Sequence, residues 1–332
     1  MKIKLSFLIL MTLLICAAEL YAAAPYYEGK ILRIIVGAGA GGGYDRMARI
    51  VAKNLPKYLP GKPTIIVENR PGANGIVAAN ALYNNEKPDG YTILTTIRSV
   101  PFPQLLKAKA AKYDVRKLSW IGSTAEEAVI FAIRTDLPYK TVDDLRKAKG
   151  PIFMGITGPQ ESTTQFAILL KEFAGLNLQM VTYQSSNEAM MGLERKEVDA
   201  RTGSYSSMKP FIDRGLMRPL IRGSASEPEI DSLPVNEDLT TDKTGKTIMA
   251  MLSVVDRIGR PYVAPPGTPA KVMAVLRDGF AKMAKDPAVQ EEAKKFQMKI
   301  KFTPAGECMK VLDYLFTQPE SIMQEFNKYI KL

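Results

Sequence analysis

The sequence predicts an α/β fold in which short parallel strands alternate with amphipathic helices. β-Branched runs at 31–36, 64–67 and 91–96 are separated by helical patterns at 44–58 and 76–83, a β-α-β-α-β order. The same alternation returns between 129 and 221, again with a glycine-containing loop between a strand and a helix. The chain has 332 residues, which is enough for two domains with a core each.

In the first half, turn residues separate each predicted strand from the next helix. The run ILRIIV at 31–36 is a buried strand, and the following helix carries an apolar stripe at Met47, Ile50, Val51 and Leu55. Pro60-Gly61, the stretch 69–72 and the stretch 88–90 supply the turns. This half is therefore expected to form one mostly parallel sheet flanked by helices.

The second half repeats this organisation. Strands are predicted at 129–134, 152–156, 179–183, 198–201 and 218–221. Helices are predicted at 141–149, 162–174 and 187–194. Thr141 is the expected N-cap of the first of these, and Asp143-Asp144 supply the acidic charge that favours a helix start.

The C-terminal part begins as a loop-rich stretch from 223 to about 246. A short strand is then predicted at 261–264, followed by a Pro- and Gly-rich turn. Helices are predicted at 270–285, 286–296 and 306–329.

The N-terminal residues 1–23 are interpreted as a secretion signal. A basic start, MKIK, precedes the apolar stretch 5–18, and small residues for cleavage follow at Ala22 to Ala24. The alternative is a lipoprotein anchor on Cys16, which the bulky preceding Ile15 disfavours. The mature chain is expected to be exported to the periplasm and to keep only Cys308, as a packing residue.

The net charge and the lack of histidine exclude several classes of function. The formal net charge is +11, and removing Lys2, Lys4 and Glu19 with the signal leaves about +10 (11 − 2 + 1). The basic residues are dispersed, so no nucleic-acid partner is predicted, although a positive field suits small anions. The chain has no histidine, which excludes histidine-dependent triads and imidazole metal sites. We therefore predict no enzyme activity, no metal and no cofactor.

The glycine loop after the first strand, GAGAGGG at 37–43, allows two interpretations. Gly37, Gly39 and Gly42 match a dinucleotide fingerprint, with Glu68 placed to hold a ribose hydroxyl, as in an exported NAD-type oxidoreductase. Alternatively, bare N–H groups at a helix N-terminus bind a carboxylate. Asp45, in the first helical turn, then either caps free N–H groups or contacts the ligand.

A matching loop occurs in the second half, in GITGPQESTTQ at 155–165. A strand ends there and a helix begins near Ser162, the expected N-cap, with Thr163 and Thr164 beside it. Two facing anion loops on two α/β lobes would hold a small acid between them.

These residues also carry a family resemblance. The chain resembles the Bug family, the periplasmic substrate-binding proteins of tripartite tricarboxylate transporters. The resemblance rests on GAGAGGGYDRMAR (37–49), VENRPGANG (67–75), KPDGYTIL (87–94), GITGPQEST (155–163), ERKEVDAR (194–201) and APPGTPAKV (264–272). It covers nearly all of the mature chain.

The resemblance implies a two-lobed Venus-flytrap fold, with lobe 1 at 24–127 plus 225–332 and lobe 2 at 128–224. Crossing segments near 127–134 and 216–222 would form the hinge. It also implies that the protein delivers a small carboxylate to membrane permease subunits or, as an alternative, presents it to a receptor as a sensor component. Independently of the resemblance, we expect a monomer. The ligand-binding residues that it implies are Gly42, Gly43, Tyr44, Asp45, Ser99, Thr157, Gly158, Ser162, Thr163, Thr164, Tyr183 and Ser204.

The chain departs from the family pattern at two places. Gln160-Glu161 stand where the family often has glycine-serine, and Gln184-Ser185 follow Tyr183 where it often has lysine-glycine. An acidic Glu161 beside an anion site would repel a second carboxylate unless its side chain points away or binds an amine. The departures leave the class of carboxylate open.

Overall fold

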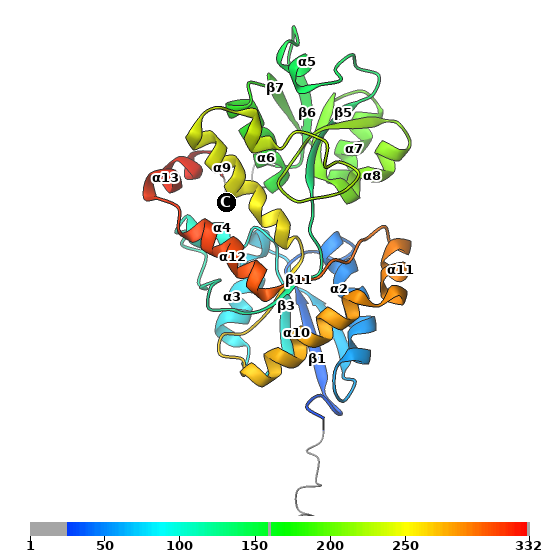
Figure 1. The fold of residues 1–332 in the computed structure, drawn as a ribbon, viewed down its shortest axis with the longest axis vertical. Helices are drawn as coiled ribbons and strands as arrows, with labels where there is room; N and C mark the ends of the chain where they lie inside the picture. Colours follow the sequence, from blue (N-terminus) through cyan, green and yellow to red (C-terminus); the bar gives the residue numbers. More distant parts are fainter. Residues whose placement is uncertain (1–24, 159–160, 331–332) are drawn as a thin grey trace, which may run out of the picture.

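The protein folds into two α/β lobes, each built on its own sheet (Figure 1). The computed structural model describes residues 25–158 and 161–330; the predicted signal at 1–23 and Gln160 lie outside them. The α/β class and the two-lobed arrangement are confirmed. Within the described ranges, no helix combines the length and apolar character needed to cross a bilayer.

The first sheet has six strands in the order β11-β4-β10-β3-β1-β2. Its parallel part pairs β1 with β2 and β3, whereas β10 inserts antiparallel between β3 and β4. The sheet is therefore mixed, because the chain returns from the other lobe to supply β10 and β11. Its strands are β1 (Ile31–Val36), β2 (Thr64–Asn69), β3 (Thr92–Thr95), β4 (Ser119–Ser123), β10 (Pro261–Ala264) and β11 (Thr303–Pro304).

Proline residues interrupt two of the predicted helices. The predicted helix at 44–58 is shorter, and a 3-10 turn (Leu55–Tyr58) follows it, because Pro56 lacks the N–H that an α-helix needs. The predicted helix at 306–329 is likewise two helices, with Pro319 at the break. The helices are α2 (Gly43–Asn54), α3 (Ile76–Asn85), α4 (Pro101–Leu105), α10 (Ala270–Lys285), α11 (Pro287–Lys295) and α12 (Ala305–Phe316).

The second sheet has five strands in the order β7-β6-β8-β5-β9. β6 pairs in parallel with β7 and β8, and β5 runs antiparallel between β8 and β9. The strands are β5 (Val129–Arg134), β6 (Ile152–Ile156), β7 (Leu178–Thr182), β8 (Ala200–Ser204) and β9 (Met217–Arg222). The helices are α5 (Val142–Arg146), α6 (Ser162–Phe173), α7 (Ser186–Glu194) and α8 (Tyr205–Asp213). Thr141 caps α5 in a full capping box, as predicted.

Helix α9 (Lys243–Val254) lies between the two sheets and begins within the stretch 223–246, for which the sequence predicts a loop (Figure 1). It packs against α6 of the second lobe and against α13 (Glu320–Tyr329). At its start Gly245 is required, because a Cβ there would lie 2.3 Å from the Phe173 ring.

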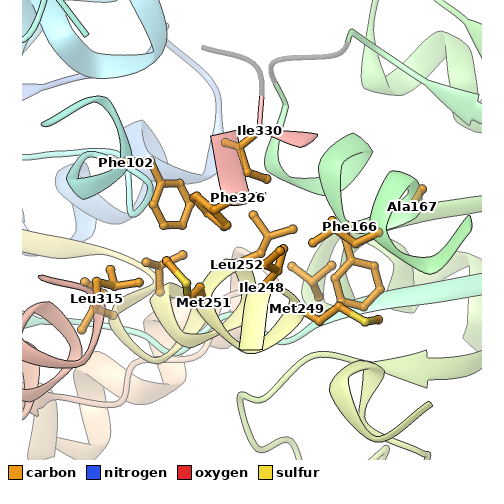
Figure 2. Packing of buried hydrophobic residues seen from close by; sticks show 14 of the residues in the cluster. Phe102, Phe166, Ala167, Ile248, Met249, Met251, Leu252, Leu315, Phe326 and Ile330 are labelled. Carbon is orange, nitrogen blue, oxygen red and sulfur yellow. The ribbon is translucent and has the colours of Figure 1, made fainter. Parts of the chain in front are cut away.

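The largest hydrophobic cluster joins the lobes through this helix. Figure 2 shows Ile248, Met249 and Leu252 of α9 between Phe166 on one side and Phe102 and Phe326 on the other. Phe102 and Phe326 make an edge-to-face contact with ring centroids 5.3 Å apart. The assignment of 225–332 to lobe 1 stays a prediction, since α9 packs on elements of both sheets.

Cys308 is fully buried on α12, in agreement with its predicted packing role. Burial raises the pKa of its thiol to about 12, which keeps it protonated and unreactive at neutral pH.

Candidate functional site

A cavity of about 830 Å³ lies between the two lobes, where strands of both sheets end. The loops after β1 and β3 line it from the first lobe, and those after β6 and β8 line it from the second. Carboxyl ends of parallel strands are the usual place for a ligand in α/β folds, because side chains and helix N-termini converge there. The volume is within the range of small-molecule sites.

The first glycine loop forms one wall of the cavity. Gly42, Gly43 and Tyr44 all line it, and Gly42 is the N-cap of α2 without a side-chain cap. The first helical hydrogen bond runs from the N–H of Arg46 to the carbonyl of Gly42, so the preceding N–H groups lie ahead of the helical ladder. This arrangement suits an anion.

Asp45 does not belong to the cavity wall. Its side chain is buried, and its carboxylate accepts the N–H of Gly41 at 2.8 Å and the Nε–H of Arg49 at 3.0 Å. Burial raises the pKa of this carboxyl, but the hydrogen bonds from Arg49 and Gly41 prevail and lower it below its ordinary value. Asp45 therefore holds the glycine loop through Gly41, the residue before the N-cap Gly42, and the helix N-terminus itself has no side-chain cap.

Two buried ion pairs that the sequence does not predict lie beside this loop. Arg260 donates to Glu127 at 2.5 Å, and Arg98 Nε lies 3.1 Å from Asp256. Both arginines and Glu127 line the cavity. Arg260 also packs over the Tyr44 ring, 5.4 Å from its centroid.

Glu127 connects the lobes at the level of the cavity. Its other oxygen accepts the hydroxyl of Ser206, from α8 of the second lobe, at 3.0 Å. Burial raises the pKa of Glu127, but Arg260 and Arg98 overcome this effect and lower it. Because Glu127 is hydrogen-bonded to residues of both lobes, a movement of one lobe relative to the other would change these hydrogen bonds.

Ser99 lines the cavity from the segment after β3, as predicted. Its hydroxyl accepts from Asn74 Nδ2 at 3.3 Å, and its side chain is buried. Nearby, the Arg98 N–H donates to the Tyr44 hydroxyl at 3.0 Å, which ties this segment to the glycine loop.

The second lobe places four of its seven predicted residues at the cavity, namely Thr157, Ser162, Thr163 and Ser204. Gly158, Thr164 and Tyr183 lie outside its lining. Thr164 is buried because the helix turns it toward the core, and the Tyr183 hydroxyl donates to Glu197 at 3.0 Å. The N-cap of α6 is Glu161, so the expected cap at Ser162 is wrong by one residue.

Arginines dominate the charge of the cavity wall. The charged residues that line it are Arg46, Arg98, Arg201, Arg260, Glu127 and Glu161. Arg201, at the end of ERKEVDAR, was also missed. The available signal was that the predicted strand at 198–201 ends on Arg201, because charged side chains are rarely buried in a strand unless they have a partner.

The dinucleotide interpretation places Glu68 at the ligand, whereas the structure places it away from the cavity. No group of three or more metal-ligating side chains occurs among the residues that the structure describes. Glu68, the expected ribose ligand, is paired with Arg70 and, at 3.4 Å, with Arg33. It does not line the cavity.

The chain is similar over most of its length to several proteins of known sequence or structure. A curated relative, the UPF0065 protein in the gbd 5′ region of Cupriavidus necator, is 27% identical over 290 residues, 86% of this chain and 84% of the relative. The crystal structure of a ligand-free TctC solute-binding protein from Polaromonas superposes with a TM-score of 0.72 at 21% identity, covering 90% of this chain and 98% of that one. An R. palustris protein solved with adipate gives 0.65 at 18% identity, covering 89% and 97%.

The sequence model of the tripartite tricarboxylate transporter family receptors, TctC, matches residues 47–328. The match covers more than half of the chain and includes both lobes. The fold, with two mixed sheets and a cavity between them, agrees with that of periplasmic binding proteins. The chain therefore belongs to the tripartite tricarboxylate transporter receptor family, whose members are periplasmic solute-binding proteins.

Proposed function

We propose that this protein captures a small organic carboxylate in the cavity between its lobes and delivers it to the permease of a tripartite tricarboxylate-type transporter. The observation that carries the proposal is the pairing of an uncapped helix N-terminus at Gly42 and Gly43 with arginines in one cavity. N–H groups and guanidinium groups both favour carboxylate oxygens. The adipate bound by the R. palustris neighbour is consistent with such a ligand.

The residues proposed to contact the ligand are those of the prediction that line the cavity. They are Gly42, Gly43, Tyr44, Ser99, Thr157, Ser162, Thr163 and Ser204. Asp45 supports the first loop, and Arg98 and Arg260 supply positive potential next to it. Export through the signal at 1–23, a monomeric state and binding without catalysis complete the proposal.

The test is a thermal-shift screen of the chain from residue 25 onward against organic acids, amino acids and NAD. A ligand that binds only the folded protein at one hundred times its Kd stabilises it by about 2.7 kcal/mol, which raises the melting temperature by several degrees. A shift with carboxylates and none with NAD is expected. A shift with NAD alone would refute the proposal and restore the oxidoreductase interpretation.

Transport and sensing are separated by a second experiment. Deleting the gene should abolish uptake of the radiolabelled acid into cells that carry the cognate permease. Unchanged uptake, with loss of an acid-induced transcriptional response, would instead assign the sensor role.

A further inference from the structure

Arg201 is a buried cation at the wall of the cavity. It lies on β8, and its register partners are Ala132 on β5 and Gly155 on β6. These two small residues leave room for a long side chain between the sheet and α7. The guanidinium donates to the carbonyl of Ser186, the first residue of α7, and Arg201 is only 7% exposed.

The other buried arginines of the cavity have acidic partners, whereas Arg201 has none among the residues that the structure describes. Arg260 is paired with Glu127 and Arg98 with Asp256. Over residues 25–158 and 161–330, no carboxylate lies within 4.0 Å of the Arg201 guanidinium. Burial lowers its pKa to about 10, so the side chain still carries its charge at neutral pH.

A buried charge without a counter-charge is costly, and proteins retain one where a ligand supplies the opposite charge. Arg201 lines the second-lobe side of the cavity, and the glycine loop lines the first-lobe side. An acid that spans the cavity would meet N–H groups at one end and a guanidinium at the other. Glu161 also lines the cavity and acts electrostatically on Arg98, whereas burial alone shifts the pKa of Arg201.

We propose that Arg201 binds a second carboxylate at the far end of the ligand and thereby makes the protein selective for dicarboxylates over monocarboxylates of the same length. This inference rests on the function proposed above and names the residue that sets its ligand class. A guanidinium binds a carboxylate through two parallel hydrogen bonds, which a lysine cannot reproduce. The site would close as the ligand joins the two lobes.

The test measures Kd by calorimetry for straight-chain dicarboxylates from succinate to suberate and for the matched monocarboxylates from butyrate to octanoate. Three variants are compared with the wild type: Arg201→Gln, Arg201→Lys and Lys171→Gln. Lys171 is the matched control, because it is an exposed cation of the second lobe that does not line the cavity. Circular dichroism and melting temperature verify that each variant is folded.

We expect the wild type to bind its best dicarboxylate at least about tenfold more tightly than the matched monocarboxylate. Arg201→Gln should remove this preference while changing monocarboxylate affinity less than about twofold, and Arg201→Lys should restore part of it. Lys171→Gln should bind like the wild type.

Other outcomes overturn the inference in recognisable ways. A dicarboxylate preference that persists in Arg201→Gln, or equal weakening of both acid classes, would assign Arg201 a structural role and leave the proposed function intact. Failure of the wild type to bind any organic acid would refute the proposed function and the inference with it.

Discussion

Replacing Gly43 by alanine tests whether the glycine loop and the arginine network form one unit. A Cβ at Gly43 would lie 2.6 Å from Arg260 Nη1 and 3.0 Å from Nη2. At the adjacent Gly42, the nearest atom to a Cβ is the carbonyl oxygen of Gly39, at 3.6 Å. Neither residue has the positive φ that penalises alanine. Gly42→Ala is therefore a matched control that differs in the contact with Arg260.

The free energy of unfolding that Gly43→Ala loses depends on how tightly the Arg260 side chain is held. An ordinary contact begins at 3.4 Å, so the guanidinium must move by about 0.8 Å. It cannot move freely, because it is 2.5 Å from Glu127 and both side chains are less than one tenth exposed. Overpacking costs about 1–3 kcal/mol, and complete loss of a buried pair costs about 3–5 kcal/mol. A shift that keeps a lengthened ion pair should cost about 2 kcal/mol.

The assay is thermal and urea unfolding of both variants and the wild type without ligand. Gly43→Ala should melt about 4 °C below the wild type, and Gly42→Ala should stay within about 1 °C of it. Equal stability of the two variants would show that Arg260 has room to retreat, and would refute a rigid coupling of the loop to Glu127.

Three further predictions concern the supports of the site. Glu127→Gln should reduce stability at neutral pH. Because the folded-state pKa of Glu127 is lowered, the difference in free energy of unfolding between wild type and variant should be constant above about pH 5 and shrink as pH falls below about 4. Urea unfolding at several pH values measures this difference. A difference that stays unchanged down to about pH 3 would contradict the ionised pair. Asp45→Ala should cost about 1 kcal/mol, since Gly41 loses its acceptor, whereas Arg49→Ala should cost at most about 0.5 kcal/mol because Arg49 is 57% exposed. Comparable unfolding free energies for the two variants would argue against a role of Asp45 in holding the glycine loop. Phe326→Ala should lower the free energy of unfolding by about 3–5 kcal/mol, because it leaves a cavity where the Phe326 ring contacts Phe102 in the cluster shared with α9. A decrease of less than about 1 kcal/mol in denaturant unfolding would mean that α13 contributes little to joining the lobes.

The sequence predicted the elements whose signals are local. The run ILRIIV, the apolar stripe of α2 and the capping residue Thr141 each act within a few residues, and all three elements begin within one residue of the expected position. The errors have local causes too. Pro56 and Pro319 shortened helices that periodicity alone had extended, because a missing N–H outweighs an apolar stripe.

Elements set by tertiary contacts were missed. Helix α9 follows a loop-rich stretch, and its buried residues face α6, α13 and Phe102 rather than one sheet. β4 is short and contains Gly122, yet it forms because β10 and β11 pair with both of its edges. Such pairings join segments more than a hundred residues apart, so no window of sequence contains both partners.

The candidate site shows the same difference between features set by local sequence and features set by tertiary contacts. The sequence by itself determined the two loops at helix N-termini and the dispersed positive charge, since backbone N–H groups and glycines act locally. Only the tertiary structure decided which acidic groups pair with Arg98 and Arg260 and that Asp45 does not line the cavity. It also decided that Arg201 is a buried cation without an acidic partner among the described residues. The physical reason is that a charge acquires its role from what surrounds it in space, and burial and counter-charges are fixed only when distant segments pack together.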